Sequence, residues 1–284
     1  MSIAGRFKRE TMIYHYTDLN AAKSITENAQ VWLTDYRFLN DTEEFTKGYE
    51  VLLDALEQYQ DYAGEYPKDL IACFSRAVEY IRDDNFSQFE RNNIFVSSFS
   101  KTTDSLSQWR SYGMYCLELD EAFVGTEDIH LLDCHYLHNE CDAIEYADTI
   151  IRIHIMPALL KIWIERKPFL IDLKLSSLLE IYALSFKHAA FVDEDEVRFV
   201  VSCSPYDERI SFRVRGQLLI PYIALEFKPQ LIKSIIVGPV DNQYLACDSI
   251  AMFARKISRK VNHNQKDNDY ALVVKNSDVP YRKI

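Results

Sequence analysis

Two glutamates and an arginine alternate along one short segment of the chain, at Glu194, Glu196 and Arg198. Residues 186–201 are expected to form a helix end, a short link and a strand, and side chains on a strand point alternately to its two faces. The charged side chains would then share one face, with the intervening apolar residues on the other. A carboxylate can stabilise a developing positive charge or act as a general base. The alternative is a solvated strand start with a local Glu196–Arg198 ion pair.

The composition indicates a folded, acidic protein. The chain has 284 residues, of which 48% are hydrophobic, and a formal net charge of −11. This content supports a substantial core, and the acidic charge argues against broad binding to nucleic-acid phosphates, although a local basic groove stays open. No apolar run reaches membrane-spanning length, and residues 1–10 lack an apolar signal core. We therefore expect a cytoplasmic protein with no membrane partner.

Six cysteines occur without any C-x-x-C pair, so reduced thiols are expected. Cys134, His135, His138 and Cys141 form one local cluster of residue types that can bind zinc. No second pair follows at the spacing of a zinc finger. A loop between a strand and a helix is favoured there, and no metal is expected.

The pattern of apolar residues predicts short strands separated by helical blocks. The expected strands are residues 12–17, 31–34, 93–100, 114–119, 130–137, a strand containing Glu196, 210–215, 222–227, 234–237 and 271–274. The expected helices are residues 20–27, 41–62, 67–85, 105–112, 140–166, 170–188 and 242–261. Asp18 and Asp104 are suited to cap the helices that follow them, and Gly113 to end one.

This order of elements predicts an α+β fold with a mostly antiparallel sheet of short strands. The helices are inserted in two blocks, at about residues 41–86 and 140–188. No Gly/Ser-rich or Pro-rich stretch marks a linker, so residues 1–284 are expected to form a single domain.

Short motifs lie in a fixed order along nearly the whole chain. They are Tyr14-His15-Tyr16-Thr17, Asn40-Asp41-Thr42-Glu43, Ser97-Ser98-Phe99-Ser100, Leu106-Ser107-Gln108-Trp109-Arg110-Ser111-Tyr112-Gly113, Phe191-x-x-Glu194-x-Glu196-x-Arg198 and Ile236-Val237-Gly238-Pro239. This set resembles the bacterial family catalogued as domain of unknown function 2971. The family name supplies no chemistry.

A second resemblance is to the ADP-ribosyltransferases, which clamp NAD in a split sheet. Their site combines a first-strand His or Arg, a strand with Ser-Thr-Ser or a Tyr, and a later strand with a catalytic Glu. Here His15 lies on the first strand, Ser98 and Ser100 end a middle strand, and Glu194 and Glu196 open a late one. The middle motif departs from a strict Ser-Thr-Ser, and the inserted helices lengthen the spacing.

The resemblance implies that NAD is a co-substrate whose nicotinamide–ribose bond is cleaved. Glu196 would stabilise the oxocarbenium-like charge on the ribose, and Glu194 would activate or orient an acceptor. His15 would hold the other ribose through a ring nitrogen. The alternative for His15 is a histidine whose hydrogen bonds are satisfied within the sheet.

Further candidates would bind other parts of NAD. Tyr14, Tyr16 and Tyr112 can stack on nicotinamide, although such residues are more often part of a core. Arg110 suits a pyrophosphate, because its guanidinium makes paired hydrogen bonds. Alternatively, Arg110 pairs with a carboxylate such as Glu194 or Asp41.

The remaining cofactor-binding candidates are Ser98, Ser100, Arg198 and Asn40. Asn40 opens an acidic helix start that is mainly structural, although it is the residue there most able to reach the site. Lys187 and His188 are expected at a helix end, where cations complement the helix dipole and need no catalytic role.

Three functions remain open. The first is an NAD-dependent transferase or glycohydrolase, such as a bacterial toxin or anti-phage effector, whose acceptor is a protein, a nucleic acid, a small molecule or water. The second is a hydrolase or nuclease that uses Glu194, Glu196, Asp41 and a divalent ion. The third is a non-catalytic module whose acidic face recognises a partner or nucleotide.

Overall fold

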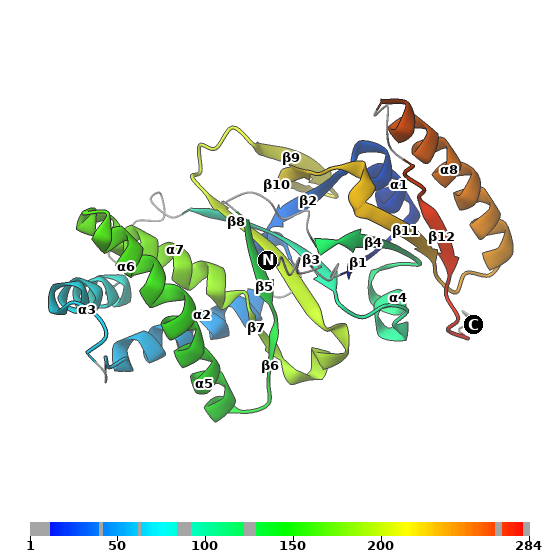
Figure 1. The fold of residues 1–284 in the computed structure, drawn as a ribbon. Coiled ribbons are helices and arrows are strands. Elements are labelled where there is room, and N and C mark those ends of the chain that lie inside the picture. The colour runs from blue at the N-terminus through cyan, green and yellow to red at the C-terminus, as the bar shows by residue number, and fades with distance from the viewer. Residues whose placement is uncertain are drawn as a thin grey trace, which may run out of the picture.

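Ten strands form one mixed, mostly antiparallel sheet in the computed structural model, with helices on both sides of it (Figure 1). The structure describes residues 12–39, 42–61, 64–83, 92–121, 129–264 and 269–280. The α+β class expected from the sequence is confirmed. None of the helices in these ranges combines the length and apolar character needed to cross a lipid bilayer.

Strand β3 (Asn93–Ser100) is the strand from which the sheet divides. One of its edges pairs along its whole length with β8 (Glu196–Cys203), so that Ser100 lies opposite Glu196. Its other edge is shared. Strand β2 (Gln30–Asp35) pairs there near one end of β3, and β1 (Met12–Thr17) pairs near the other. The sheet is therefore split between β1 and β2.

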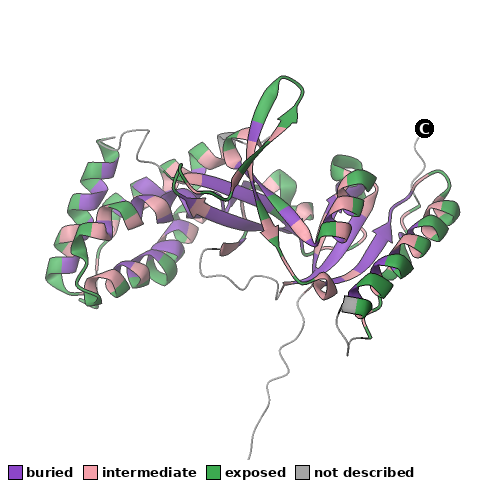
Figure 2. Ribbon diagram, turned by 90° about the horizontal axis from the view of Figure 1, so that it is seen from above, coloured by how far each residue is buried: buried purple, intermediate pink, exposed green. Residues whose placement is uncertain are grey.

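Each side of the split continues into its own set of strands. Beyond β1 lie β4 (Tyr115–Asp120), β11 (Ile232–Val237) and β12 (Val273–Asn276). Beyond β2 lie β10 (Leu218–Glu226) and the edge strand β9 (Ile210–Arg215). Among the strand pairs that the structure describes in this sheet, β11–β12 alone is parallel. Figure 2 shows the β9–β10 hairpin projecting away from the rest of the sheet.

The two faces of β3 belong to different cores. Phe95 and Phe99 point into a cluster to which α1 (Leu19–Asn28) and α8 (Gln243–Asn264) contribute. Ile94 points into the cluster of the helical group on the other face. Both faces of β3 are therefore covered, and the strand is buried along most of its length.

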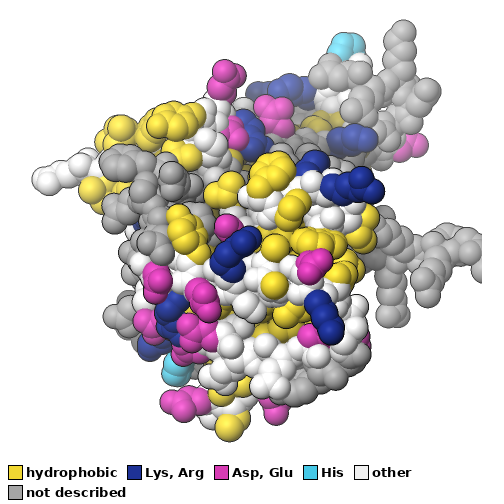
Figure 3. Space-filling model, turned by 90° about the vertical axis from the view of Figure 1, so that its left-hand side faces the viewer, with side chains coloured by type: hydrophobic (Ala, Val, Ile, Leu, Met, Phe, Trp, Pro, Cys, Tyr) yellow, Lys and Arg dark blue, Asp and Glu magenta, His cyan; other side chains and the backbone are white. Residues whose placement is uncertain are grey.

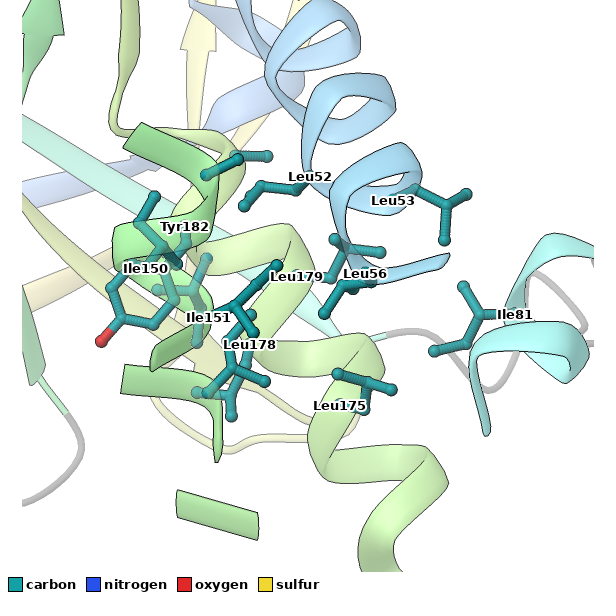
Figure 4. Close-up of a cluster of buried hydrophobic side chains, with 14 of the residues drawn as sticks. Leu52, Leu53, Leu56, Ile81, Ile150, Ile151, Leu175, Leu178, Leu179 and Tyr182 are labelled. Carbon is teal, nitrogen blue, oxygen red and sulfur yellow. The ribbon is translucent and has the colours of Figure 1, made fainter. Parts of the chain in front are cut away.

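The helices of the two inserted segments pack against one another at the left of Figure 1. They are α2 (Thr42–Gln58), α3 (Lys68–Arg82), α5 (Glu140–Ile150), α6 (Met156–Ile164) and α7 (Ile171–Ala183). Figure 4 shows Leu52 and Leu56 of α2 facing Leu178 and Leu179 of α7. The outer face of this group mixes apolar side chains with charges of both signs (Figure 3), so the net negative charge is not concentrated there.

Residues 140–166, predicted as one helix, are divided by a π-helical turn at Ile151–Ile155. Pro157 follows directly, in the first turn of α6. Because proline has no backbone N–H, it cannot continue the α-helical hydrogen bonds, and the chain changes its hydrogen-bond spacing just before it.

Two other expected elements are also divided. The strand predicted at residues 130–137 forms β5 (Ile129–Asp133), which pairs with β8, and β6 (His135–Leu137). The helix predicted to run to residue 188 ends at Ala183, and β7 (Phe186–His188) follows it. β6 and β7 pair in parallel as a separate ribbon. The prediction of a helix end at residues 186–188 was therefore wrong.

Asp104 does not cap the short helix α4 (Leu106–Tyr112), as the sequence had suggested. Ser105 occupies the cap position, and Asp104 adopts a φ of +54°. Its carboxylate accepts hydrogen bonds from Trp109 Nε1 and from the backbone N–H of Asp278, both at 2.9 Å. Asp104 thus fastens α4 to the last segment that the structure describes.

Gly113 joins α4 to β4 and packs against the end of β1. Its φ is +135°, and a Cβ placed there would lie 2.3 Å from the carbonyl oxygen of Thr17. Gly113→Ala is expected to lower the free energy of unfolding by about 3 kcal/mol, through backbone strain and this contact. Gly216→Ala is the control, since Gly216 also has positive φ (+61°) but no atom within 4 Å of its Cβ, and should cost about 1 kcal/mol. Urea unfolding of both variants measures the difference, and equal losses would contradict the role given to Thr17.

Candidate active site

A cavity of about 550 Å³ lies at the split between β1 and β2, within the size range of small-molecule sites. Residues from both faces of the sheet line it, which is possible because β1 and β2 are not paired with each other. The sequence-predicted candidates in its lining are Tyr14, His15 and Tyr16 from β1, Ser98 and Ser100 from β3, Tyr112 from α4, Glu194 and Glu196.

Three predicted residues are not placed in the cavity wall. Arg198 is buried behind Glu196 and donates from Nη1 to the carbonyl oxygen of Leu184 at 2.8 Å. Arg110 is exposed on α4 and is not a lining residue. Asn40, like Asp41, lies outside the described residues.

Glu194 is not on the strand, which corrects the expectation that it shares a strand face with Glu196. It ends a 3₁₀ helix, Ala189–Glu194, and Asp195 with a φ of +40° turns the chain into β8. Its carboxylate nevertheless lies beside that of Glu196, because both bind the same lysine, Lys187. Tyr112 donates its hydroxyl to the other oxygen of Glu194 at 3.1 Å.

Lys187 on β7 is the residue that holds the two carboxylates together. Its Nζ lies 2.7 Å from Glu194 Oε2 and also donates to Glu196 Oε2, and the lysine is 6% exposed. Burial alone would lower the pKa of Lys187, but the two glutamates outweigh it and raise the pKa. This position was not predicted from the sequence, because Lys187 was expected at a helix end.

Glu196 is held by Arg198 as well as by Lys187. Arg198 donates from Nε to Oε1 at 2.8 Å and from Nη2 to Oε2 at 3.0 Å, a paired arrangement that fixes the carboxylate plane. Burial would raise the pKa of Glu196, but Arg198 and then Lys187 outweigh it and lower the pKa to about 2. Glu196 is therefore charged in the folded protein at neutral pH.

The low pKa of Glu196 links folding to pH. The usual value is 4.5 and the folded value about 2, so the folded state is stabilised above pH 4.5. This contribution, on the order of 3 kcal/mol, is lost as the pH falls from 4.5 through 2. We expect the thermal midpoint to fall across this range, and to fall less steeply in Glu196→Gln. Thermal unfolding followed by circular dichroism at several pH values tests this, and parallel curves for the two proteins would contradict it.

His15 is neutral and points one ring nitrogen at β3. Burial lowers its pKa, and Nδ1 lies 3.0 Å from the carbonyl oxygen of Ser98. A carbonyl oxygen only accepts, so Nδ1 carries the proton and the lone pair is on Nε2. The ring is packed against Phe99, with centroids 5.0 Å apart. His15 thus offers a fixed acceptor for a hydroxyl group.

The three tyrosines differ in how free they are to contact a ligand. The Tyr16 ring is buried edge-on against Trp109, and its hydroxyl donates to the Thr102 carbonyl at 3.0 Å. Tyr14 is half-buried, with its hydroxyl 3.4 Å from a carboxylate oxygen of β4. Tyr112 is 48% exposed. Of the three, Tyr112 presents the most open ring to a ligand.

The two serines have different positions. Ser100 is buried, and its hydroxyl donates to the Glu194 carbonyl at 2.7 Å, which ties the 3₁₀ helix to β3. Ser98 is exposed, and its carbonyl oxygen fixes His15. Ser98 is therefore the serine that can present its side chain to a ligand, while Ser100 positions Glu194.

Compared with known proteins, the chain matches no protein-family model, no curated protein and no solved structure. Its function must be argued from the geometry of the site.

The cysteine–histidine cluster does not assemble in the structure. Cys134 is buried and Cys141 exposed, while the ring of His135 is stacked on Tyr146 at 4.1 Å. In the part of the chain that the structure describes, no three His, Cys, Asp or Glu side chains converge so as to hold a metal ion.

The site offers hydrogen-bond acceptors and negative charge to whatever binds. A carboxylate has about four acceptor positions. Glu194 uses one on each oxygen, for Tyr112 and Lys187, and Glu196 has one position left on Oε1. Together with Nε2 of His15, these acceptors suit a ligand with several hydroxyl groups and a centre that becomes positively charged.

Proposed function

We propose that this protein cleaves the nicotinamide–ribose bond of NAD, as an ADP-ribosyltransferase or NAD glycohydrolase. The observation that carries the proposal is the meeting of His15, Glu194 and Glu196 in one cavity at the split of the sheet. The acceptors they present fit the hydroxyl groups of ribose. The sequence resemblance to ADP-ribosyltransferases points to the same three residues.

Each residue has a defined part in the proposed reaction. The bond between nicotinamide and C1′ of the ribose breaks, and its electron pair leaves with the neutral nicotinamide. The positive charge that develops on the ribose is stabilised by Glu196, which is held charged and rigid. Glu194 accepts the proton of the attacking hydroxyl or amine as the new bond to C1′ forms. His15 accepts a hydrogen bond from a ribose hydroxyl.

Incubation of the purified chain with NAD tests this directly. We expect NAD to raise the thermal midpoint, because a ligand that binds only the folded state stabilises it by about 3 kcal/mol at a hundred times its Kd. We also expect release of free nicotinamide, measured by liquid chromatography, with no loss of activity on adding EDTA. Release that stops on chelation would favour the metal-dependent hydrolase. If NAD neither raises the thermal midpoint nor releases nicotinamide, even with protein and nucleic-acid acceptors present, the proposal is refuted.

A further inference from the structure

The cavity contains a cation that the proposed reaction does not use. Arg213 of the edge strand β9 lines it, beside Trp32 and Thr34 of β2. Its Nη2 donates to Thr34 Oγ1 at 3.0 Å, and its guanidinium lies 5.4 Å from the centre of the Trp32 ring. Its Nε is buried without a hydrogen-bond partner. A buried donor left unpaired is costly, so the hydrogen-bonding capacity of this guanidinium is not satisfied within the protein.

Arg213 lacks the carboxylate partner that several of the described arginines have. Arg37, Arg82, Arg198 and Arg209 each pair with a carboxylate. Among the described residues, no carboxylate pairs with Arg213. In a chain with a net charge of −11, a guanidinium that faces a cavity without a counterion is a ready site for an anion.

The guanidinium is held in place before any ligand binds. The Trp32 ring beneath it is itself stacked on Tyr222, with centroids 4.4 Å apart. Tyr222 and Arg213 come from the two strands of the β9–β10 hairpin, so the hairpin and β2 fix the arginine together. A donor fixed in this way loses little side-chain entropy on binding.

The position of Arg213 relative to the glutamates limits the ligand. Thr34 lies opposite Val96 of β3, whereas Glu196 lies opposite Ser100. Four residues of strand span about 13 Å, and the long side chains extend from these positions into the cavity. A ligand that reaches both must carry its anionic group away from the reacting sugar, at the β2 side of the split.

We propose that Arg213 binds the phosphate or pyrophosphate of a nucleotide in this cavity. If the nucleotide is NAD, this inference rests on the proposed function. The pyrophosphate of NAD would then lie on the side of the cavity that is next to β2. The guanidinium then donates from its two terminal nitrogens to phosphate oxygens, a paired geometry that arginine favours. Arg213 takes the role that the sequence had suggested for Arg110.

The test compares a ligand that has phosphates with one that lacks them. Isothermal titration measures the Kd of NAD and of nicotinamide riboside for the wild type, Arg213→Gln and Arg215→Gln. Arg215 is exposed on the same strand and does not line the cavity, so its variant controls for the lost charge. We expect Arg213→Gln to raise the Kd of NAD at least about tenfold, as for a lost charged hydrogen bond. Nicotinamide riboside should bind all three proteins alike.

The outcomes separate this inference from the proposed function. If NAD binds the wild type and Arg213→Gln equally, the inference is wrong and the proposed function stands. If NAD does not bind but ADP or inorganic pyrophosphate binds and depends on Arg213, the inference stands and the proposed function fails. If the wild type binds neither NAD nor ADP nor inorganic pyrophosphate, the inference is overturned. Should Arg213→Gln not fold, Arg213→Lys keeps the charge without the paired donors and should give an intermediate Kd.

Discussion

Glu196→Gln is expected to reduce the rate of nicotinamide release from saturating NAD at least about a hundredfold. The substitution keeps the shape of the side chain but removes the negative charge that faces the developing oxocarbenium ion, and losses of this size follow removal of one such electrostatic contact. Because Arg198 and Lys187 also lose their counterion, the turnover rate must be measured on protein shown to be folded at the assay temperature.

Glu118→Gln is the matched control for this measurement. Glu118 is a buried carboxylate on β4 that binds Ser234 and Lys275 and does not itself line the cavity. It also accepts from the hydroxyl of Tyr14 at 3.4 Å, and the amide oxygen of glutamine can still accept this hydrogen bond. Its variant should lose stability but keep the turnover rate. If a folded Glu196→Gln protein releases nicotinamide at the wild-type rate, Glu196 has no catalytic role and serves only as part of an internal ion pair.

Lys187→Met should lower the free energy of unfolding by about 3–5 kcal/mol. Methionine fills much the same volume, but the substitution leaves Glu194 and Glu196 facing each other in a buried site without the cation that separates them. Removing one partner of a buried ion pair has a cost of this size, because Glu194 then has no cationic partner among the described residues and Glu196 keeps only Arg198. Guanidinium or urea unfolding at pH 7 measures it.

Lys101→Met provides the comparison, since Lys101 and Asp133 form an ion pair at 2.6 Å that is largely exposed. Its loss should cost less than about 1 kcal/mol. The loss of unfolding free energy in Lys187→Met should also be smaller in acid, where a proton can neutralise one of the two carboxylates. A loss of unfolding free energy that is small at pH 7, or equal at pH 7 and pH 4, would show that Lys187 does not hold Glu194 and Glu196 together.

Most strands were predictable because short apolar runs, some of them alternating with polar residues, lie between turn residues, whereas the order of the strands in the sheet was not predicted. The same alternation correctly put Glu196 and Arg198 on one face of β8. The position of Lys187 beside the two glutamates could not be predicted from the sequence. The apolar spacing of α7 runs on to Leu184 without a glycine or proline, so nothing local marks the end of the helix at Ala183. The strand β7 exists because β6 pairs with it, and such a partner is not visible in local sequence.

Arg213 was missed for a related reason. Ser211, Arg213 and Arg215 alternate with Phe212 and Val214, a pattern that is typical of a strand with one solvated face. Only the pairing of β9 with β10, and of β10 with β2, brings one of these arginines to the cavity. The glutamates could be found because they are grouped at a strand start, whereas nothing in the sequence distinguishes Arg213 from the neighbouring Arg215.

The pairing of β3 with β8 has a consequence for how the protein folds. Ser100 and Glu194, joined by a hydrogen bond, are 94 residues apart in sequence, and His15 is 83 residues from its partner Ser98. Contacts over such separations close large loops and form slowly, whereas the helices of the intervening segment form through local contacts. We infer that α5, α6 and α7 become ordered before β8 joins β3. The cavity would then be completed late in folding, and a newly made chain could not bind its ligand until β8 had been synthesised and paired.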